Sequence, residues 1–195
     1  MDNAFQYDQY TIKKQVLALT GILRIYNTQD QLVLFSQQKM FKLKEDIRVF
    51  ADETKSRELL NIKARQILDF SAYYDVIDSQ YSTPVGGLRR KGLRSLVQDE
   101  WEVLDPQGNS LGILKEDSLN RALLRRFLLG RLLPQNYDLL FGADRVGDYK
   151  QQFQLFRYIL NIDFRMDSGK KLDHRLGLAA GILLAIIEGR QHQEG

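Results

Sequence analysis

The chain has 195 residues, of which 44% are hydrophobic and 27% charged, and its formal net charge is +3 at neutral pH. This composition is ordinary for a soluble globular protein, and the length suits one sizeable core, so we expect a single domain over residues 1–195. Cysteine is absent, which excludes disulfides, thiol nucleophiles and zinc–thiolate sites and fits a reducing cytosol. The opening residues have no basic and then apolar run, so we expect no signal peptide.

Hairpin-like units recur along the first two-thirds of the chain. Their turn residues are Asn27, Asp52, Asp78 and Asp105, spaced 25, 26 and 27 residues apart. Each turn residue follows a strand-like run and precedes a second apolar run, at 32–35, 59–62, 85–88 and 111–114. Side chains of this kind accept hydrogen bonds from the backbone ahead of them and open turns. A metal-ligand role is the alternative, but each hairpin supplies only one such residue, and no cluster forms a coordination shell.

A period near 26 residues predicts a strand–turn–strand unit copied several times. Further strand-like runs lie at 10–16, 21–25, 137–141, 148–153 and 158–164. Hairpins of this kind join one sheet, and closing that sheet removes its exposed edges. We therefore expect a β-barrel.

Two basic segments interrupt this pattern. The first follows Gly86 and Gly87, is expected to cross a hairpin tip, and contains Arg89, Arg90, Lys91 and Arg94. The second is a predicted helix over 118–133, inserted between hairpins, with Arg121, Arg125 and Arg126 beside a broad apolar stripe. A basic amphipathic helix can lie at a membrane surface, and arginine matches phosphate oxygens. The simpler alternative is a helix packed on the outside of the barrel, with its arginines solvated or paired to acidic loops.

The segment 176–187 is apolar on every side of a helix. We predict a helix over 174–188, with Asp173 as its N-cap and Gly189 just past its end. The apolar segment is too short to span a bilayer core of roughly 20 residues, so we expect the curved sheet to enclose it. An ordinary core helix in a mixed domain is the alternative. The four-residue spacing of Gly177, Gly181 and Ala185 favours close approach of this helix to the strands over membrane dimerisation.

The chain resembles the LURP-one-related family, which belongs with the Tubby C-terminal domains and phospholipid scramblases. The matching segments are 10–14, 23–27, 41–43, 47–52, 74–78, 101–108 and 173–180. The resemblance implies a mostly β fold, namely a closed antiparallel β-barrel of about twelve strands around a buried C-terminal apolar helix. Tubby domains bind phosphoinositides through basic residues, and scramblases associate with membranes and respond to calcium. The helix over 118–133 departs from the family pattern, and the cysteine cluster and proline-rich leader of scramblases are absent.

Catalytic and metal-binding motifs are missing from the sequence. His174 begins the apolar helix and His192 lies in a polar tail, so they form neither a metal site nor a nucleophile–base pair. Gly86-Gly87 lacks the Gly-Lys-Ser/Thr of a phosphate loop, and no serine lies in a nucleophile elbow. We therefore expect a protein that is not an enzyme and has no cofactor and no metal site.

The expected function is binding of anionic, phosphoinositide-like phospholipid head groups by a cytoplasmic protein that is peripheral at the membrane. The expected contacts are Arg89, Arg90, Lys91, Arg94, Arg121, Arg125 and Arg126. The alternative is a structural or protein-interaction barrel that docks partners through 118–133. Nucleic acid is not expected, because aromatic residues are not interleaved with the basic ones. We expect no transmembrane span, and the sequence leaves the oligomeric state open.

Overall fold

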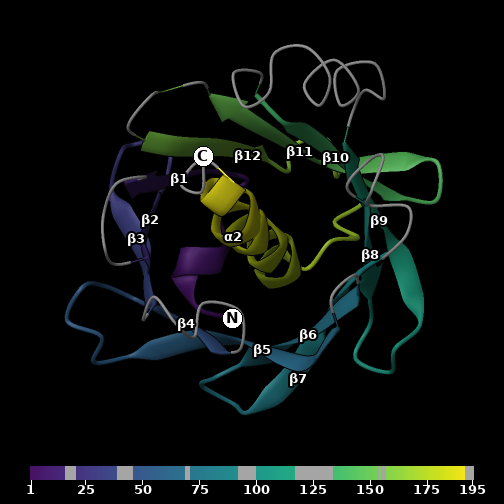
Figure 1. Ribbon diagram of the computed structural model, residues 1–195, viewed down its shortest axis with the longest axis horizontal. Coiled ribbons are helices and arrows are strands. Elements are labelled where there is room, and N and C mark those ends of the chain that lie inside the picture. Colours follow the sequence, from purple (N-terminus) through teal and green to yellow (C-terminus); the bar gives the residue numbers. More distant parts are fainter. Residues whose placement is uncertain are drawn as a thin grey trace.

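The computed structural model describes residues 1–15, 21–38, 46–68, 71–91, 100–116, 134–152, 154 and 157–191. Within this part of the chain, twelve strands form one closed antiparallel barrel, in which each strand pairs with the next and β1 pairs with β12 (Figure 1). The strands are β1 (Gln9–Gln15), β2 (Gly21–Tyr26), β3 (Leu32–Gln38), β4 (Asp46–Phe50), β5 (Glu58–Leu68), β6 (Ser71–Asp78), β7 (Thr83–Arg90), β8 (Glu100–Leu104), β9 (Ser110–Glu116), β10 (Asn136–Phe141), β11 (Asp144–Gln152) and β12 (Arg157–Asp163). A short 3-10 helix, η1 (Asn3–Phe5), precedes them, and α2 (His174–Gln191) follows. The predicted mostly β fold with a C-terminal helix is confirmed.

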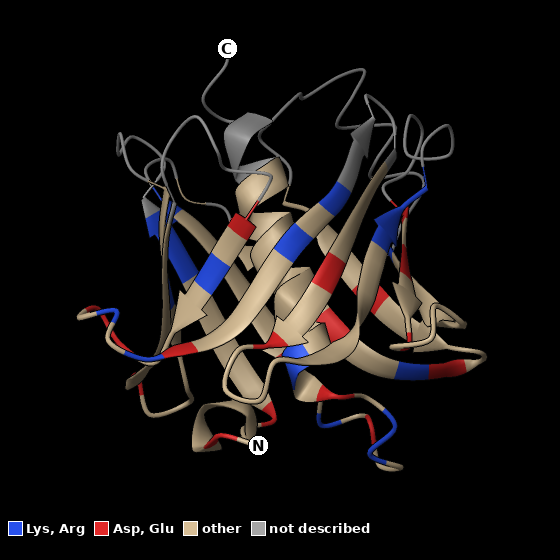
Figure 2. Ribbon diagram, turned by 90° about the horizontal axis from the view of Figure 1, so that it is seen from below, with Lys and Arg blue, Asp and Glu red and all other residues tan. Residues whose placement is uncertain are grey.

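The barrel has two ends, which we call the lower and the upper rim (Figure 2). The lower rim is the end where α2 begins, and its turns lie at 27–31, 51–57, 79–82, 105–109 and 142–143. The upper rim is the end where α2 ends, and there β1, β5, β7 and β9 end at Gln15, Leu68, Arg90 and Glu116. The chain therefore crosses between neighbouring strands alternately at the two rims.

Alternate residues of each strand face the barrel interior, as strand geometry dictates. In β1, Tyr10, Ile12 and Lys14 are buried, whereas Thr11 and Lys13 are partly exposed. The same alternation is visible in β2 and β4, whereas β7 and β11 each have four buried residues in a row. The inward side chains of the strands form one apolar core around α2.

The helix α2 lies inside the barrel, and apolar side chains on all its sides are buried (Figure 1). They are Leu176, Leu178, Ala179, Ala180, Ile182, Leu183, Leu184, Ala185 and Ile186. Burying one leucine or isoleucine side chain contributes about 1.5–3 kcal/mol, so this helix is a large part of the core energy. Among the described residues, no helix is both long and apolar enough to cross a bilayer.

The start of α2 follows the prediction, and its end does not. Asp173 caps the first turn, because its Oδ1 accepts a hydrogen bond from the backbone N–H of Arg175 at 2.9 Å. The predicted stop at Gly189 is wrong, since α2 continues through it to Gln191. A glycine inside a helix costs only about 1 kcal/mol, so it weakens a helix without ending it.

Two glycines allow α2 to approach the strands closely. A Cβ atom on Gly181 would lie 2.5 Å from Cδ1 of Ile162, and one on Gly177 would lie 2.6 Å from Cζ of Phe164. The Tyr149 hydroxyl donates a hydrogen bond to the carbonyl of Gly177 at 3.0 Å. The small residues therefore serve packing inside the barrel, as predicted.

Candidate functional site

The four predicted turn residues close the lower rim by local hydrogen bonds. The Oδ1 atoms of Asn27, Asp52, Asp78 and Asp105 accept from backbone N–H groups two residues ahead, at 3.0, 2.8, 3.0 and 2.9 Å. The hydrogen bond from the Thr54 hydroxyl lowers the pKa of Asp52, and the Asn109 side chain does the same for Asp105. Within the described part of the chain, no group of three or more His, Asp or Glu residues is placed to hold a metal ion.

Arg175 joins the start of α2 to one of these turns. Its Nη1 lies 2.6 Å from Oδ2 of Asp78, and its Nη2 lies 2.5 Å from Oδ2 of Asp173. The Asp78 side chain is only 4% exposed, so Arg175 supplies the positive charge beside a buried carboxylate. The hydrogen bond to Asp173 also raises the pKa of Arg175.

The first basic segment is described only as far as Lys91, and its residues alternate in direction. Arg89 faces outward and pairs with Glu102, to whose Oε2 its Nε donates at 2.9 Å. Lys91 pairs with Glu100, at 2.8 Å between Nζ and Oε1. Arg90 is the cross-strand partner of buried Trp101, and its guanidinium lies 6.0 Å from the centre of that ring. Arg90 therefore faces the barrel interior and not the surface shared by Arg89 and Lys91.

The cations of these two pairs are more exposed than their carboxylates. The side chain of Arg89 is 49% exposed and that of Glu102 is 14% exposed. The side chain of Lys91 is likewise more exposed than that of Glu100, at 31% and 17%. The hydrogen bond from Arg89 holds the pKa of Glu102 below its usual value, so this carboxylate stays ionised at neutral pH.

The other predicted site residues, Arg94, Arg121, Arg125 and Arg126, and the predicted helix over 118–133 lie outside the described residues. The strands that lead to them are described. Arg90 pairs with Trp101, and Glu100 pairs with Lys115, so the ends of β7 and β9 lie on either side of β8. The strands that precede the two undescribed segments therefore end at neighbouring points of the upper rim.

Polar side chains point into the barrel near the upper rim. Lys14 is 6% exposed, and its Nζ donates a hydrogen bond to the carbonyl of Ala185 at 3.3 Å. Gln135 and Gln151 are buried and bond each other, since the backbone N–H of Gln135 donates to Oε1 of Gln151 at 2.8 Å. Glu116 is also buried. Sequence reasoning missed this set, although the two-residue period from Tyr10 indicates that Lys14 faces inward.

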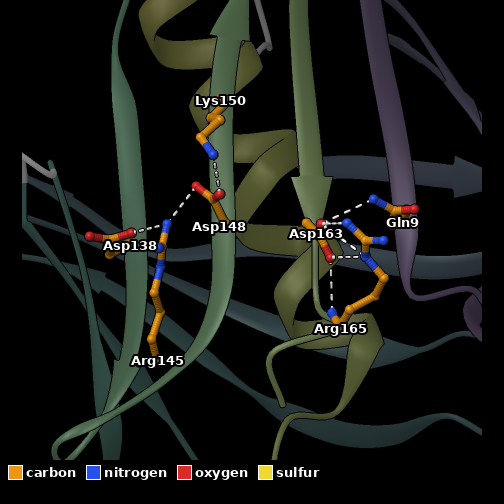
Figure 3. A network of polar contacts seen from close by, with 7 residues as sticks. All are labelled: Gln9, Asp138, Arg145, Asp148, Lys150, Asp163 and Arg165. Carbon is orange, nitrogen blue, oxygen red and sulfur yellow. Dashed lines mark hydrogen bonds and ion pairs between the residues drawn. The ribbon is translucent and has the colours of Figure 1, made fainter. Parts of the chain in front are cut away.

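A row of carboxylates on the outer face of β10, β11 and β12 was also missed (Figure 3). Asp138, Asp148 and Asp163 occupy consecutive cross-strand positions, where like charges destabilise a sheet unless they are neutralised. Arg145 bridges Asp138 and Asp148, at 2.5 and 2.8 Å, and Arg165 pairs with Asp163 at 2.7 Å.

The negative charge of this row is therefore neutralised by neighbouring arginines. The hydrogen bond from Arg165 also lowers the pKa of Asp163. A polar hollow of about 220 Å³ lies beside it, with Asp148, Lys150, Asn161 and Asp163 in its lining. Lys150 also pairs with Asp148, at 2.7 Å between Nζ and Oδ2. The hollow is lined by side chains that already bond one another.

A second hollow, of about 590 Å³, lies at the lower rim between the N-terminal residues and the start of α2. Its lining includes Phe5, Phe164 and His174. The rings of His174 and Phe164 are 4.8 Å apart between centres, so this histidine packs against the core. His192 lies outside the described residues.

The comparisons with known proteins agree with the barrel. The model of the LURP-one-related family matches residues 32–184, a range that begins at β3 and ends within α2. The comparisons with curated proteins and with solved structures found no match. The family match covers well over half of the chain, and it includes the repeated hairpins and the enclosed apolar helix. The chain therefore belongs to the LURP-one-related family.

Proposed function

We propose that this protein is a non-enzymatic binding module whose upper rim binds anionic phospholipid head groups at a membrane surface. The contacts are Arg89 and Lys91 on the outer face, with Arg94, Arg121, Arg125 and Arg126 in the segments that follow β7 and β9. A protein of this kind needs several cations close together, because each phosphate contact at an exposed surface is weak.

The arrangement of the strand ends carries this proposal. The segment with Arg94 continues from β7, and the segment with Arg121, Arg125 and Arg126 continues from β9, with only β8 between them. Two basic segments that start from adjacent positions on one rim can serve one surface. Segments starting from opposite rims could not.

Arg90 has a different part in the proposal, because it faces the interior beside Trp101. A guanidinium over an indole ring is held by the ring's negative face. We therefore assign Arg90 a supporting role in the packing at the end of β7, and the outward contacts to its neighbours Arg89 and Lys91.

Flotation with liposomes tests the proposal. The purified chain is mixed with vesicles of phosphatidylcholine alone, or of phosphatidylcholine with a phosphatidylinositol bisphosphate, and the floated fraction is measured. We expect recovery on the bisphosphate vesicles only. Equal recovery on the two kinds of vesicle would overturn the proposal.

Variants then locate the surface. We expect Arg89→Gln, Lys91→Gln and Arg94→Gln together to remove most of the flotation. The matched control is Arg165→Gln, Lys170→Gln and Lys171→Gln, which removes the same charge from exposed positions at the lower rim. A loss of flotation in the control as large as that in the upper-rim triple would indicate attraction by net charge alone.

The protein-docking alternative predicts a different result. If 118–133 docks a partner, deletion of that segment releases the partner, and the mass measured by size-exclusion chromatography with light scattering falls by more than the mass of the deleted residues. A deletion variant that stays folded with the same oligomeric state and partners, together with flotation lost in the upper-rim triple, supports the lipid proposal over the docking one.

A further inference from the structure

The outward cations of the upper rim are already bound to carboxylates of the same protein. Arg89 and Glu102 are direct cross-strand partners in the ladder between β7 and β8. One step further along, the backbone N–H of Lys91 donates to the carbonyl of Glu100 at 3.0 Å, which places Lys91 beside Glu100 in the same way. Both pairs are therefore set by the backbone register and exist before any ligand arrives.

We propose that Glu100 and Glu102 determine the specificity of this surface. Their ion pairs with Arg89 and Lys91 persist in the presence of singly charged head groups and are displaced by head groups with several phosphates. The inference rests on the proposed function, because it concerns the same cations. It assigns a role to two acidic residues that the charge pattern of the basic segment does not reveal.

The exposures of the four side chains support this arrangement. Each cation is more exposed than its carboxylate partner, so an incoming anion meets the cations first and the glutamates lie behind them. Arg89 uses Nε and Nη2 for one oxygen of Glu102, and within the described residues its Nη1 forms no hydrogen bond. Nη1 is therefore available for a first contact with a phosphate oxygen.

The charge of the head group then determines whether it displaces the glutamates from Arg89 and Lys91. A singly charged head group exchanges one carboxylate for one phosphate at one cation, and it remains near the carboxylates of Glu100 and Glu102, which repel it. A head group with several phosphates bridges Arg89 and Lys91 together, so its attraction to both cations exceeds the same repulsion. Discrimination by a repulsive element is a general route to specificity. The hydrogen bond from Arg89 lowers the pKa of Glu102, which keeps the repulsion present at neutral pH.

The test is the double variant Glu100→Gln with Glu102→Gln, which keeps the side-chain shape and removes both charges. Affinity is measured for vesicles with phosphatidylserine and for vesicles with a phosphatidylinositol bisphosphate. We expect affinity for phosphatidylserine to rise on the order of fivefold to tenfold, since two exposed pairs are released, and affinity for the bisphosphate to rise less. The ratio of the affinity for bisphosphate vesicles to the affinity for phosphatidylserine vesicles therefore falls.

The matched control is Asp30→Asn with Glu53→Gln. These carboxylates also pair with exposed cations, at 2.8 Å to Lys13 and 2.5 Å to Arg24, but they lie in turns of the lower rim. The control changes the net charge equally, so we expect it to raise both affinities slightly and leave their ratio unchanged. An unchanged ratio in the Glu100/Glu102 variant, or an equal change in the control, would overturn the inference.

The outcomes separate this inference from the proposed function. If the wild-type chain binds neither vesicle, the proposed function fails. If it binds the bisphosphate vesicle, loses that binding with Arg89→Gln, and keeps its preference in the glutamate variant, only the specificity role fails. Titration with soluble inositol trisphosphate and with inorganic phosphate tests the same ratio without a membrane, and distinguishes a free phosphate ligand from a lipid. The single variants Glu100→Gln and Glu102→Gln, each expected to narrow the preference partly, replace the double variant if it does not fold.

Discussion

The two rims of the barrel satisfy their polar groups in different ways. At the lower rim, the side chains of Asn27, Asp52, Asp78 and Asp105 bond backbone groups of their own turns. Near the upper rim, polar groups bond partners far away in the sequence, as Lys14 does with Ala185 and Arg89 with Glu102.

This difference predicts that the lower rim contributes to stability and the upper rim to ligand binding. At the lower rim, the turn side chains form hydrogen bonds within their own turns. Arg175 also joins the start of α2 to one of these turns. The strands β7 and β9, which precede the two undescribed segments, end at the upper rim, where Arg89 and Lys91 form partly exposed pairs with Glu102 and Glu100. We therefore expect changes at the lower rim to affect the free energy of unfolding, and changes on the outer face of the upper rim to affect ligand binding.

The largest expected effect comes from breaking the helix that joins the rims. Ala180→Asp places a carboxylate at a position that is 2% exposed and lies among the apolar side chains of the core, and we expect the chain not to fold. Circular dichroism and a thermal melt measure this. The control Leu111→Asp alters a residue that is 39% exposed and should melt cooperatively. A folded, cooperatively melting Ala180→Asp variant would show that α2 is not enclosed.

A smaller effect is expected from the Arg175 bridge at the lower rim. Arg175→Met removes the cation beside Asp78, whose side chain is only 4% exposed, and leaves that carboxylate without its ion pair. We expect a loss of about 3 kcal/mol in the free energy of unfolding, measured by urea denaturation. Arg165→Gln is the control, because its ion pair is on the surface and is worth about 1 kcal/mol or less. Equal losses in the two variants would contradict the special role of Arg175.

The next largest loss of stability is expected from a change in one turn of the lower rim. Asn27 is 4% exposed, and its Oδ1 accepts hydrogen bonds from the backbone N–H groups of Gln29 and Gln31, both at 3.0 Å. We expect Asn27→Ala to lower the free energy of unfolding by about 1–3 kcal/mol, because two hydrogen bonds are lost. The neighbouring exposed residue serves as the control, and Thr28→Ala should change stability by no more than about 0.5 kcal/mol. A similar change in both variants would mean that the Asn27 side chain does not hold the turn.

The smallest effect is a dependence of stability on pH. Hydrogen bonds from Thr54, Asn109, Lys171 and Arg165 lower the pKa values of Asp52, Asp105, Asp144 and Asp163. A depressed carboxyl pKa stabilises the folded state above the ordinary value of about 4, and the contribution is lost as the pH falls through the lower folded value. We expect the melting temperature to fall when the pH is lowered from about 4, with little change near neutrality. Asp105→Asn should flatten this fall slightly, and a steeper fall would contradict the assignment.

Features that depend on neighbouring residues could be predicted from the amino-acid sequence. The turn residue Asn27 and the N-cap Asp173 bond atoms only two residues away, so their residue types and positions predict their contacts. The apolar segment 176–187 has no polar side to expose, so enclosure follows from its composition alone. The repeat near 26 residues predicted the hairpins for the same local reason.

Contacts between side chains of distant segments could not be predicted, because they depend on how the strands and α2 pack together. The register between β7 and β8 puts Glu102 beside Arg89, and a shift of one residue would put the two side chains on opposite faces of the sheet. The row of Asp138, Asp148 and Asp163 depends on two such registers, and the contact of Lys14 with Ala185 depends on the position of α2 in the barrel. Register and packing are set by the whole core and not by any local pattern. The contacts of these charged side chains therefore could not be predicted from the sequence.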